Sequence, residues 1–391
     1  MTENSQNGRY ILYGAVANRP EKPSSDTKVW LKKILDRIAF RLGQKSKINY
    51  KNYQRHYTYN RGDHSIIVAT AQQLRKVYPN SEIITIDWEK LIVTNIRKKD
   101  KILICGSGYF FPNSEGIFPQ RLHRDLEAIE ASGAELHFLG VGYNYLLDWK
   151  PATGSSLPTE SSELVQKLLA QATTLTVRDE NTKRFLSGFT NREIDVIGDP
   201  ALFIETTSHF QFINDKTRPP QIGINIPFHG HEPTEWIKKH LAQFAKILKS
   251  LKRSTGCDFT YFVHYDSEVL IAALIEDQGI PITVIDTDAV DLPHEYSKMD
   301  IHIGGMLHSC IIATAVGTPC IGLAYDEKHF GFFELMERSD YCLKANPFNA
   351  NELLQKSINL LKKSTSERTK IKARRQDLML KFKRTLKGIV T

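Results

Sequence analysis

The chain has 391 residues, of which 41% are hydrophobic and 25% are charged, with 23 Gly and 16 Pro. These values exclude collagen-like, coiled-coil and wholly disordered proteins, and the length predicts two domains. No run of about 20 apolar residues and no basic-then-apolar N-terminus occurs, so we expect neither a transmembrane span nor a secretory signal. The five cysteines are scattered without CxxC spacing, which predicts neither a zinc site nor a disulfide framework. We therefore expect a cytoplasmic protein.

The net charge of +8 is unevenly distributed. Residues 351–391 hold 12 Lys or Arg against three acidic residues, so the other 350 residues together are nearly neutral, although they include a second basic stretch at 28–51. A nucleic-acid binder is therefore not indicated. In the C-terminal segment, basic residues interleave with four apolar ones: Leu378, Leu380, Phe382 and Leu386. This pattern predicts a helix that either docks on an anionic membrane surface or packs back across the two domains.

Short β-branched runs alternate with longer helical patterns along the chain. The predicted strands are 10–13, 82–87, 101–105, 135–141, 174–177, 194–197, 221–226, 258–264, 282–285, 301–303 and 320–323. The predicted helices are 65–77, 121–131, 161–171, 180–186, 234–254, 267–277, 307–316 and 349–362. This alternation is typical of right-handed βαβ units and parallel sheets.

The alternating pattern restarts after a polar segment at 214–220 that contains two prolines. We predict an N-terminal Rossmann-like domain over 1–213, a linker over 214–220, a C-terminal Rossmann-like domain over 221–348 and a basic helical segment over 349–391. The fold class is therefore α/β, with two doubly wound parallel-sheet domains facing a cleft. Ligands of such folds bind at the carboxyl ends of the strands, which places the expected site in that cleft.

A first candidate site motif, Asn60-Arg61-Gly62-Asp63-His64, precedes a predicted helix. Gly62 would let the backbone approach a ligand closely, and the helix start offers free N–H groups. Asp63 would either cap the helix or accept a proton from a sugar hydroxyl.

Two further candidates end strands of the first half. Gly106 and Gly108 form a tight turn directly after the strand 101–105, and such a turn suits an oxygen-rich ligand. Arg178 ends the strand 174–177, where its guanidinium would bind a carboxylate or phosphate, or else pair with Asp179 or Asp199.

The second half contains the richest candidate. Gly304 and Gly305 follow a strand, and His308 and Ser309 open the next helix. A double glycine between strand and helix predicts an anion pocket, and the histidine adds a titratable group at its mouth.

Polar side chains also end other strands of this half. Tyr325 and Lys328 follow the strand 320–323. His264 and Asp266 lie at the end of another predicted strand, 258–264. Lys328 could contact a phosphate or carboxylate. These groups converge with His308 only if the strands are parallel, as predicted.

In order, these segments resemble the polysaccharide pyruvyl transferase family. The resemblance spans about 55–330 and uses NxGD at 60–63, the glycine turn, FLGVG at 138–142, VRD at 177–179, GDPA at 198–201, LHS at 307–309 with GTP at 317–319, and YDEK at 325–328. It implies two Rossmann-like domains arranged as in GT-B glycosyltransferases.

The resemblance also implies an activity: transfer of the enolpyruvyl group of phosphoenolpyruvate to a sugar or lipid-linked oligosaccharide, usually as a pyruvate ketal. His308 would then be the acid or phosphate-side group, and Arg178 and Lys328 would hold the donor anions. Asp63 and the glycine turn would face the acceptor. The resemblance implies no cofactor and no metal.

This sequence departs from the family pattern at Met306, where an arginine usually stands two residues before the histidine. A methionine cannot neutralise a phosphate. Two alternatives therefore stay open: a GT-B glycosyltransferase that grips a nucleotide-sugar with the helix start at His308 and Ser309, and a non-catalytic glycan-binding or assembly protein.

Overall fold

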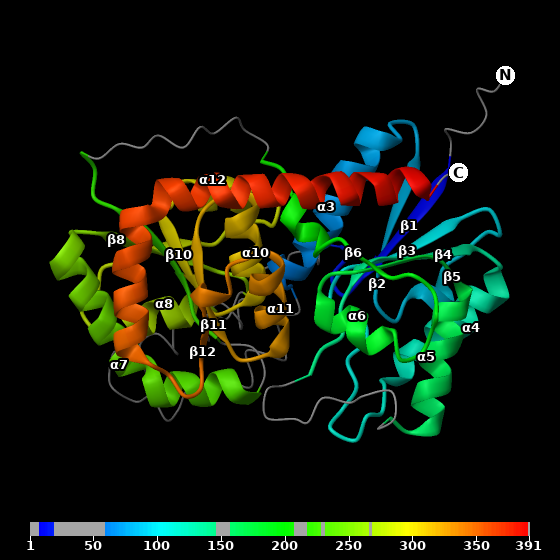
Figure 1. Ribbon diagram of the computed structural model, residues 1–391, viewed down its shortest axis with the longest axis horizontal. Helices are drawn as coiled ribbons and strands as arrows, with labels where there is room; N and C mark the ends of the chain where they lie inside the picture. The colour runs from blue at the N-terminus through cyan, green and yellow to red at the C-terminus, as the bar shows by residue number, and fades with distance from the viewer. Residues whose placement is uncertain are drawn as a thin grey trace, which may run out of the picture.

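The computed structural model describes residues 8–18, 59–145, 157–206, 217–227, 231–265 and 268–389. The predicted basic stretch at 28–51 and Asp266 lie outside these residues. The described residues form two parallel six-stranded sheets with helices packed around them, and a long C-terminal helix runs from one half to the other (Figure 1).

The first sheet contains every strand up to residue 196. Its strands are β1 (Arg9–Gly14), β2 (Glu82–Asp87), β3 (Lys101–Cys105), β4 (Glu135–Val141), β5 (Ala172–Val177) and β6 (Asp195–Val196), in the order β2-β1-β3-β4-β5-β6. The helices of this half are α3 (Arg61–Val77), α4 (Gln120–Ser132), α5 (Thr159–Gln171) and α6 (Glu180–Leu186), with 3-10 turns η3 (Leu91–Val93) and η4 (Pro200–Phe203). The order reverses at β1, so the carboxyl ends of β1 and β3 form a topological switch point.

The second sheet contains the strands from residue 221 onward. They are β7 (Gln221–Asn225), β8 (Asp258–Phe262), β9 (Thr283–Ile285), β10 (Ile301–Gly304), β11 (Cys320–Ala324) and β12 (Cys342–Lys344), in the order β12-β11-β10-β7-β8-β9. The other elements are α7 (His231–Thr255), α8 (Val269–Glu276), α9 (Leu292–Ser297), α10 (Leu307–Ala315), α11 (Glu327–Leu335), η6 (Ser339–Tyr341) and α12 (Ala350–Gly388). This is the strand order of the Rossmann fold, with its switch point between β7 and β10.

The prediction of strands alternating with helices is confirmed, and each predicted element has a counterpart in the structure. The sequence analysis missed β12, which is only three residues long, and the short helices α9 and α11. It also started α3 four residues late. Asn60 caps this helix, because its Oδ1 accepts hydrogen bonds from the backbone N–H groups of Gly62 at 2.9 Å and Asp63 at 3.3 Å. The alternative prediction, that Asp63 caps this helix, is therefore wrong.

The two sheets divide the chain around the predicted linker, although residues 207–216 lie outside the described part. The proposed division at 214–220 runs between β6 and β7. The apolar cores are not separate, however. The core of the first sheet includes Leu307 and Ile311 of α10 and Phe333 of α11, so helices of the second half complete it.

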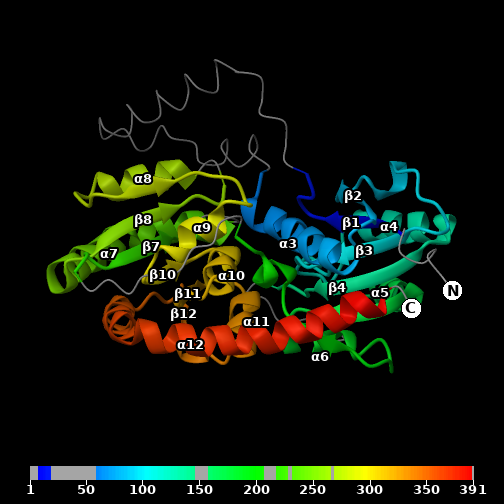
Figure 2. The ribbon, with the colours of Figure 1, turned by 90° about the horizontal axis from the view of Figure 1, so that it is seen from above.

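The C-terminal helix α12 begins on the second half and ends on the first (Figures 1 and 2). Leu378, Phe382 and Leu386 are fully buried in the core of the first sheet, whereas Leu380 is 53% exposed. The Phe382 ring lies 4.5 Å from that of Phe203, centroid to centroid. The helix therefore packs back across both halves, and in this conformation Leu378, Phe382 and Leu386 cannot insert into a membrane.

No helix among the described residues is both long and apolar enough to span a membrane.

Candidate functional site

The helix starts predicted as sites in each half meet at the interface between the halves. Gly62 lies in the first turn of α3 and His308 in the first turn of α10. A Cβ built on Gly62 would lie only 2.4 Å from the Cβ of His308. Gly62 was predicted to admit a ligand, and this is corrected: its missing side chain admits the imidazole of His308.

His308 lies between two carboxylates of the first half. Its Nδ1 is 3.6 Å from Oδ1 of Asp63, and its Nε2 is 3.6 Å from Oδ2 of Asp199. The His308 and Asp63 side chains are 14% and 20% exposed, whereas Asp199 is only 2% exposed. A titratable ring held between an accessible and a buried acid can receive a proton on one side and release it on the other.

The glycine turns of the first half hold the loop that carries Asp199. A Cβ on Gly140 would lie 2.4 Å from the backbone oxygen of Gly198, and a Cβ on Gly106 would lie 3.0 Å from Cδ of Pro200. Gly108 similarly admits the amide of Asn144, which a Cβ would approach to 2.2 Å. These contacts account for Gly106 and Gly108 by packing, so a role in ligand contact is not needed to explain them.

The double glycine before α10 is surrounded by other residues of the protein and leaves no space for a ligand. Gly305 N donates to the backbone oxygen of Asn225 at 2.7 Å, and a Cβ on Gly305 would lie 2.2 Å from Pro227. A Cβ on Gly304 would lie 2.5 Å from Oγ of Ser309. The predicted anion pocket is therefore corrected at Gly304 and Gly305, whose lack of side chains serves the packing of β10 against α10.

Ser309 also faces inward. Its side chain is fully buried, and its hydroxyl donates to the backbone oxygen of Met306 at 2.7 Å and lies 3.0 Å from Nε2 of His302. The predicted contact of this hydroxyl with an anion is thus corrected, because both of its partners are inside the protein.

His264 lies beneath the site rather than in it. Its Nε2 is 2.8 Å from the Tyr296 hydroxyl, and the ring is fully buried. Burial, reinforced by the neighbouring His308 and His302, holds the pKa of His264 well below its usual value. His264 is therefore a neutral ring behind His308, and the prediction that it contacts substrate is corrected.

Asn60 and Arg61 fasten the start of α3 to the second half. Asn60 Nδ2 donates at 2.6 Å to Oδ2 of Asp63 and to the hydroxyl of Tyr265. Arg61 donates to Asp286 at 2.6 Å and to the backbone oxygen of Thr287 at 2.7 Å. These bonds fix Asp63 relative to His308, so Asn60 orients a neighbour instead of standing free for substrate.

Two predicted cations also approach each other across the interface. Lys328 Nζ lies 3.2 Å from Asp326 and 5.3 Å from the ring centroid of Tyr325. Burial alone would lower the pKa of Lys328, but Asp326 and Tyr325 outweigh burial and the nearby Arg178, so the pKa is raised. Lys328 therefore keeps its charge, and Tyr325 packs beside it.

Arg178 is almost fully buried. Its Nε donates to Asp179 at 3.0 Å and its Nη2 donates to the backbone oxygen of Tyr143 at 3.3 Å and to the side chain of Asn144. The predicted alternative of a pair with Asp179 is thus confirmed. These bonds hold the guanidinium close to Lys328, with Nε and Nη2 already in use.

Sequence reasoning missed three residues that shape this site. Asp199 was considered only as a partner for Arg178, although its place after a glycine at the end of β6 was a usable signal. Arg61 was passed over inside its own motif. Asn225 is a polar residue ending an apolar strand, and its side chain accepts from Met306 N at 2.9 Å and donates to Glu268 at 3.0 Å.

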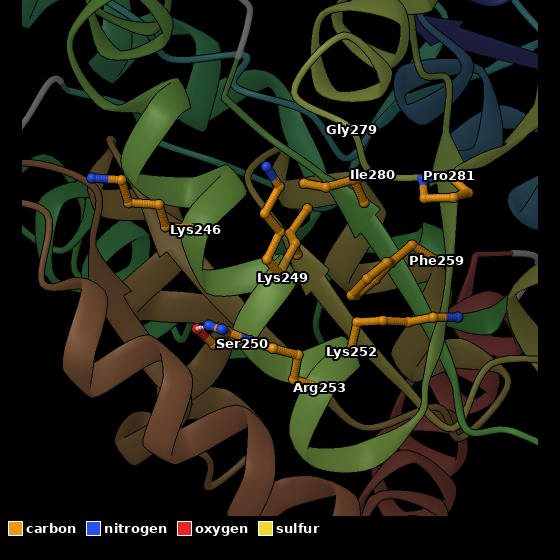
Figure 3. Close-up of a pocket in the computed structure, with 10 residues that line it drawn as sticks. Lys246, Lys249, Ser250, Lys252, Arg253, Phe259, Gly279, Ile280 and Pro281 are labelled. Carbon is orange, nitrogen blue, oxygen red and sulfur yellow. Dashed lines mark hydrogen bonds between the residues drawn. The ribbon is translucent and has the colours of Figure 1, made fainter.

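A separate pocket of about 550 Å³ lies elsewhere, between α7 and the starts of β8 and β9 (Figure 3). Lys249, Phe259 and Pro281 are among the residues that line it. Since Phe259 is near the beginning of β8 and Pro281 precedes β9, this pocket lies at the amino ends of the strands, opposite the end that carries His308. It is not part of the candidate site.

Among the described residues, no group of three or more His, Cys, Asp or Glu side chains is arranged to hold a metal ion.

The two Rossmann-like halves, with His308 between Asp63 and Asp199 at their interface, define a GT-B-like α/β protein. A family model described as polysaccharide pyruvyl transferase matches residues 60–327, which is more than half of the chain. The chain therefore belongs to the polysaccharide pyruvyl transferase family.

Solved structures support the fold. A Listeria monocytogenes protein assigned as a UDP-N-acetylglucosamine 2-epimerase is 12% identical, with a TM-score of 0.52 over 93% of this chain and 90% of that one. The S. aureus MnaA structure with UDP is 13% identical, with a TM-score of 0.50 over 91% and 88% of the two chains. A mutant of S. aureus TarM is 10% identical, and its TM-score of 0.46, over 84% of this chain and 58% of that one, is too low to support the fold. No curated protein matches the chain in sequence.

Proposed function

We propose that this protein transfers the enolpyruvyl group of phosphoenolpyruvate to sugar hydroxyls of a cell-surface or exopolysaccharide glycan, forming a pyruvate ketal. Membership of the family supports the reaction class. The observation that carries the proposal is the placement of His308 between Asp63 and Asp199 at the interface of the two halves. This reaction needs an acid and a base in close reach of each other, and the site supplies both.

In the proposed reaction, His308 protonates the methylene carbon of phosphoenolpyruvate, which leaves a cation at the neighbouring carbon. A sugar hydroxyl adds to this carbon and gives its proton to Asp63, the more exposed of the two carboxylates. The bond between this carbon and the phosphate oxygen then breaks, and phosphate leaves. A second sugar hydroxyl adds at the same carbon and closes the ketal. The proton of the second hydroxyl leaves with the phosphate. In total, the methylene carbon gains one proton and the phosphate gains one.

The donor's carboxylate and phosphate need positive charge. Lys328 is held in its charged form by Asp326, and the Arg178 guanidinium lies close enough to oppose that charge. Two cations kept near each other at the same interface favour the binding of an anion between them. We assign Lys328 and Arg178 to the donor and Asp63 to the acceptor.

The test is incubation of the protein with phosphoenolpyruvate and candidate free or lipid-linked sugars, followed by measurement of released phosphate and of product mass. Transfer should disappear in His308→Ala and survive in Lys249→Ala, a variant at the remote pocket. Stabilisation by a nucleotide-sugar but not by phosphoenolpyruvate in a thermal shift would favour a glycosyltransferase instead. Stabilisation by neither donor, with no transfer, would favour a non-catalytic role.

A further inference from the structure

The two nitrogen atoms of His308 have unequal surroundings. Nδ1 faces Asp63, on the side of the ring where the side chains are partly exposed. Nε2 faces Asp199 and is itself buried. Within the described part of the chain, neither Nε2 nor Oδ2 of Asp199 has a hydrogen-bond partner. Two buried polar atoms without other partners, 3.6 Å apart, can satisfy each other after a small movement of either side chain.

Asp199 is also held so that only this one oxygen is available. Its Oδ1 accepts a hydrogen bond from Ala201 N at 2.9 Å and thereby caps η4. The loop is fixed from behind, because Gly140 leaves room for the backbone of Gly198 and for Pro200. Oδ2 is consequently a fixed, buried acceptor that points at Nε2.

The geometry points to Asp199 as a positioning residue that keeps a proton on Nε2 of His308, which makes Nδ1 the nitrogen that exchanges a proton with the substrate. This inference rests on the proposed function for its chemistry. A carboxylate accepts an N–H and cannot donate one, so each acid favours hydrogen on the nitrogen that faces it. The buried Asp199, whose Oδ2 has no other partner among the described residues, does so more strongly than the partly exposed Asp63.

The protons of the proposed cycle then balance through Nδ1. The Nδ1–H bond breaks as the methylene carbon of the donor gains the proton, and His308 is left neutral with hydrogen on Nε2. Asp63 takes the proton of the first sugar hydroxyl. Because Oδ1 of Asp63 lies 3.6 Å from Nδ1, that proton can return to His308 and restore the acid.

The charged and titratable groups around His308 agree with this assignment. Asp63 approaches Nδ1 from α3, and Asp199 approaches Nε2 from the start of η4. His264, after β8, is close enough to interact with His308 but is a buried neutral ring. The two acids are therefore the charged groups that face the ring nitrogens of His308.

The direct test is nitrogen NMR of histidine-labelled protein without substrate, with the signals of His308 assigned through His308→Gln. In wild type, the neutral ring should carry its hydrogen on Nε2. A wild-type ring with hydrogen on Nδ1 would overturn the inference without any variant. Since no substrate is involved, this result is independent of whether phosphoenolpyruvate is the donor.

The matched variants are Asp199→Asn and Asp63→Asn. Asn still caps η4, but its amide can donate to Nε2, so the hydrogen of the neutral ring should move to Nδ1. Asp63→Asn should keep the hydrogen on Nε2. In the transfer assay, Asp199→Asn should lower kcat by roughly 10²- to 10⁴-fold with little change in KM for phosphoenolpyruvate. An unchanged ring form or an unchanged kcat in Asp199→Asn would contradict the assignment.

Discussion

Gly62 and His308 are in such close contact that any side chain at position 62 would clash with the histidine. The Cβ of an alanine there would lie 2.4 Å from the Cβ of His308 and 2.7 Å from its Nδ1. The shortest observed contacts between such carbon atoms are longer, so one of the two helix starts would have to move. Through this contact, the first turn of α3 fixes the position of the imidazole, and the first turn of α10 limits which residue can stand at position 62.

Gly62→Ala should consequently lower the free energy of unfolding by about 1–3 kcal/mol, the usual cost of overpacking, and should also displace His308 from its two acids. Urea unfolding measures the first effect and the transfer assay the second. Gly388→Ala is the matched control, since a Cβ at Gly388 meets no atom within 4 Å. A stable and fully active Gly62→Ala protein would show that the two helix starts are not in contact in solution.

Replacement of His308 should separate chemistry from folding. His308→Ala removes the proposed acid, and general acid catalysis is worth roughly 10²- to 10⁴-fold in rate, so turnover should fall at least that far. We expect only a small change in melting temperature. Nε2 of His308 is buried without a hydrogen bond among the described residues, so removing the ring breaks no hydrogen bond at that atom. If the variant turned over normally, or if it unfolded outright, the assignment of His308 as the catalytic acid would be wrong.

Much of the fold was predictable because its physical signals are local. Apolar strands such as 101–105 and 135–141 appear at the predicted bounds, and their alternation with helices indicated parallel sheets. The parallel arrangement then correctly implied that residues after different strands converge. Asp63 and His308, 245 positions apart in sequence, were both proposed for the site from their own motifs and from the family resemblance, and they lie 3.6 Å apart.

The direction of each side chain was less predictable, because it depends on packing between the two halves. Ser309 follows His308 directly, yet its hydroxyl is buried beneath the site while the histidine faces Asp63. Gly62 was predicted to make room for a ligand but makes room for a side chain 246 positions away. Asp199 was considered only as a partner for Arg178, because its position after a glycine indicates a site but does not show which side chain it faces.

Met306 is where the family pattern would have an arginine. Its side chain is buried, with 6% exposure, and its backbone N–H is held by Asn225. If an arginine here reaches the donor anion, Met306→Arg should tighten phosphoenolpyruvate binding about tenfold or more, since a hydrogen bond to a charged group is worth about 1.5–3 kcal/mol.

Isothermal titration of phosphoenolpyruvate measures this change directly. Met306→Gln is the control for a polar but uncharged side chain at the same position. Equal affinity in the arginine variant and wild type, with folding intact, would mean that the donor anion binds away from position 306.

The end of α12 is expected to hold the first half together. Phe382→Ala should lower the free energy of unfolding by about 3–5 kcal/mol, because its ring is fully buried against Phe203. Leu380→Ala, two residues away on the exposed side, should change it by less than about 0.5 kcal/mol. Similar values for the two variants would show that the helix end detaches from the core in solution. In that case, co-sedimentation with anionic vesicles becomes the next measurement.

Glu268 should make the protein less stable as the pH rises. Its side chain is fully buried, Oε2 accepts from His264 N at 2.7 Å, and Oε1 has no hydrogen-bond partner in the described part of the chain. Burial, only partly offset by these hydrogen bonds, raises the pKa of Glu268 to about 8 from its usual value of 4.5. The folded protein thus keeps a proton that the unfolded chain has already lost.

Between pH 4.5 and about 8 the folded state binds one more proton than the unfolded state, so the contribution of Glu268 to stability falls as pH rises, by up to about 1.4 kcal/mol per pH unit. Glu268→Gln keeps the size of the side chain but cannot ionise. The free energy of unfolding of this variant, minus that of wild type, should increase steadily over the same window when urea unfolding is measured at several pH values. Glu276→Gln, at the exposed end of α8, controls for the loss of one carboxylate. A difference that is flat from pH 5 to 8 would mean that Glu268 is ionised in the folded protein and that its charge is compensated.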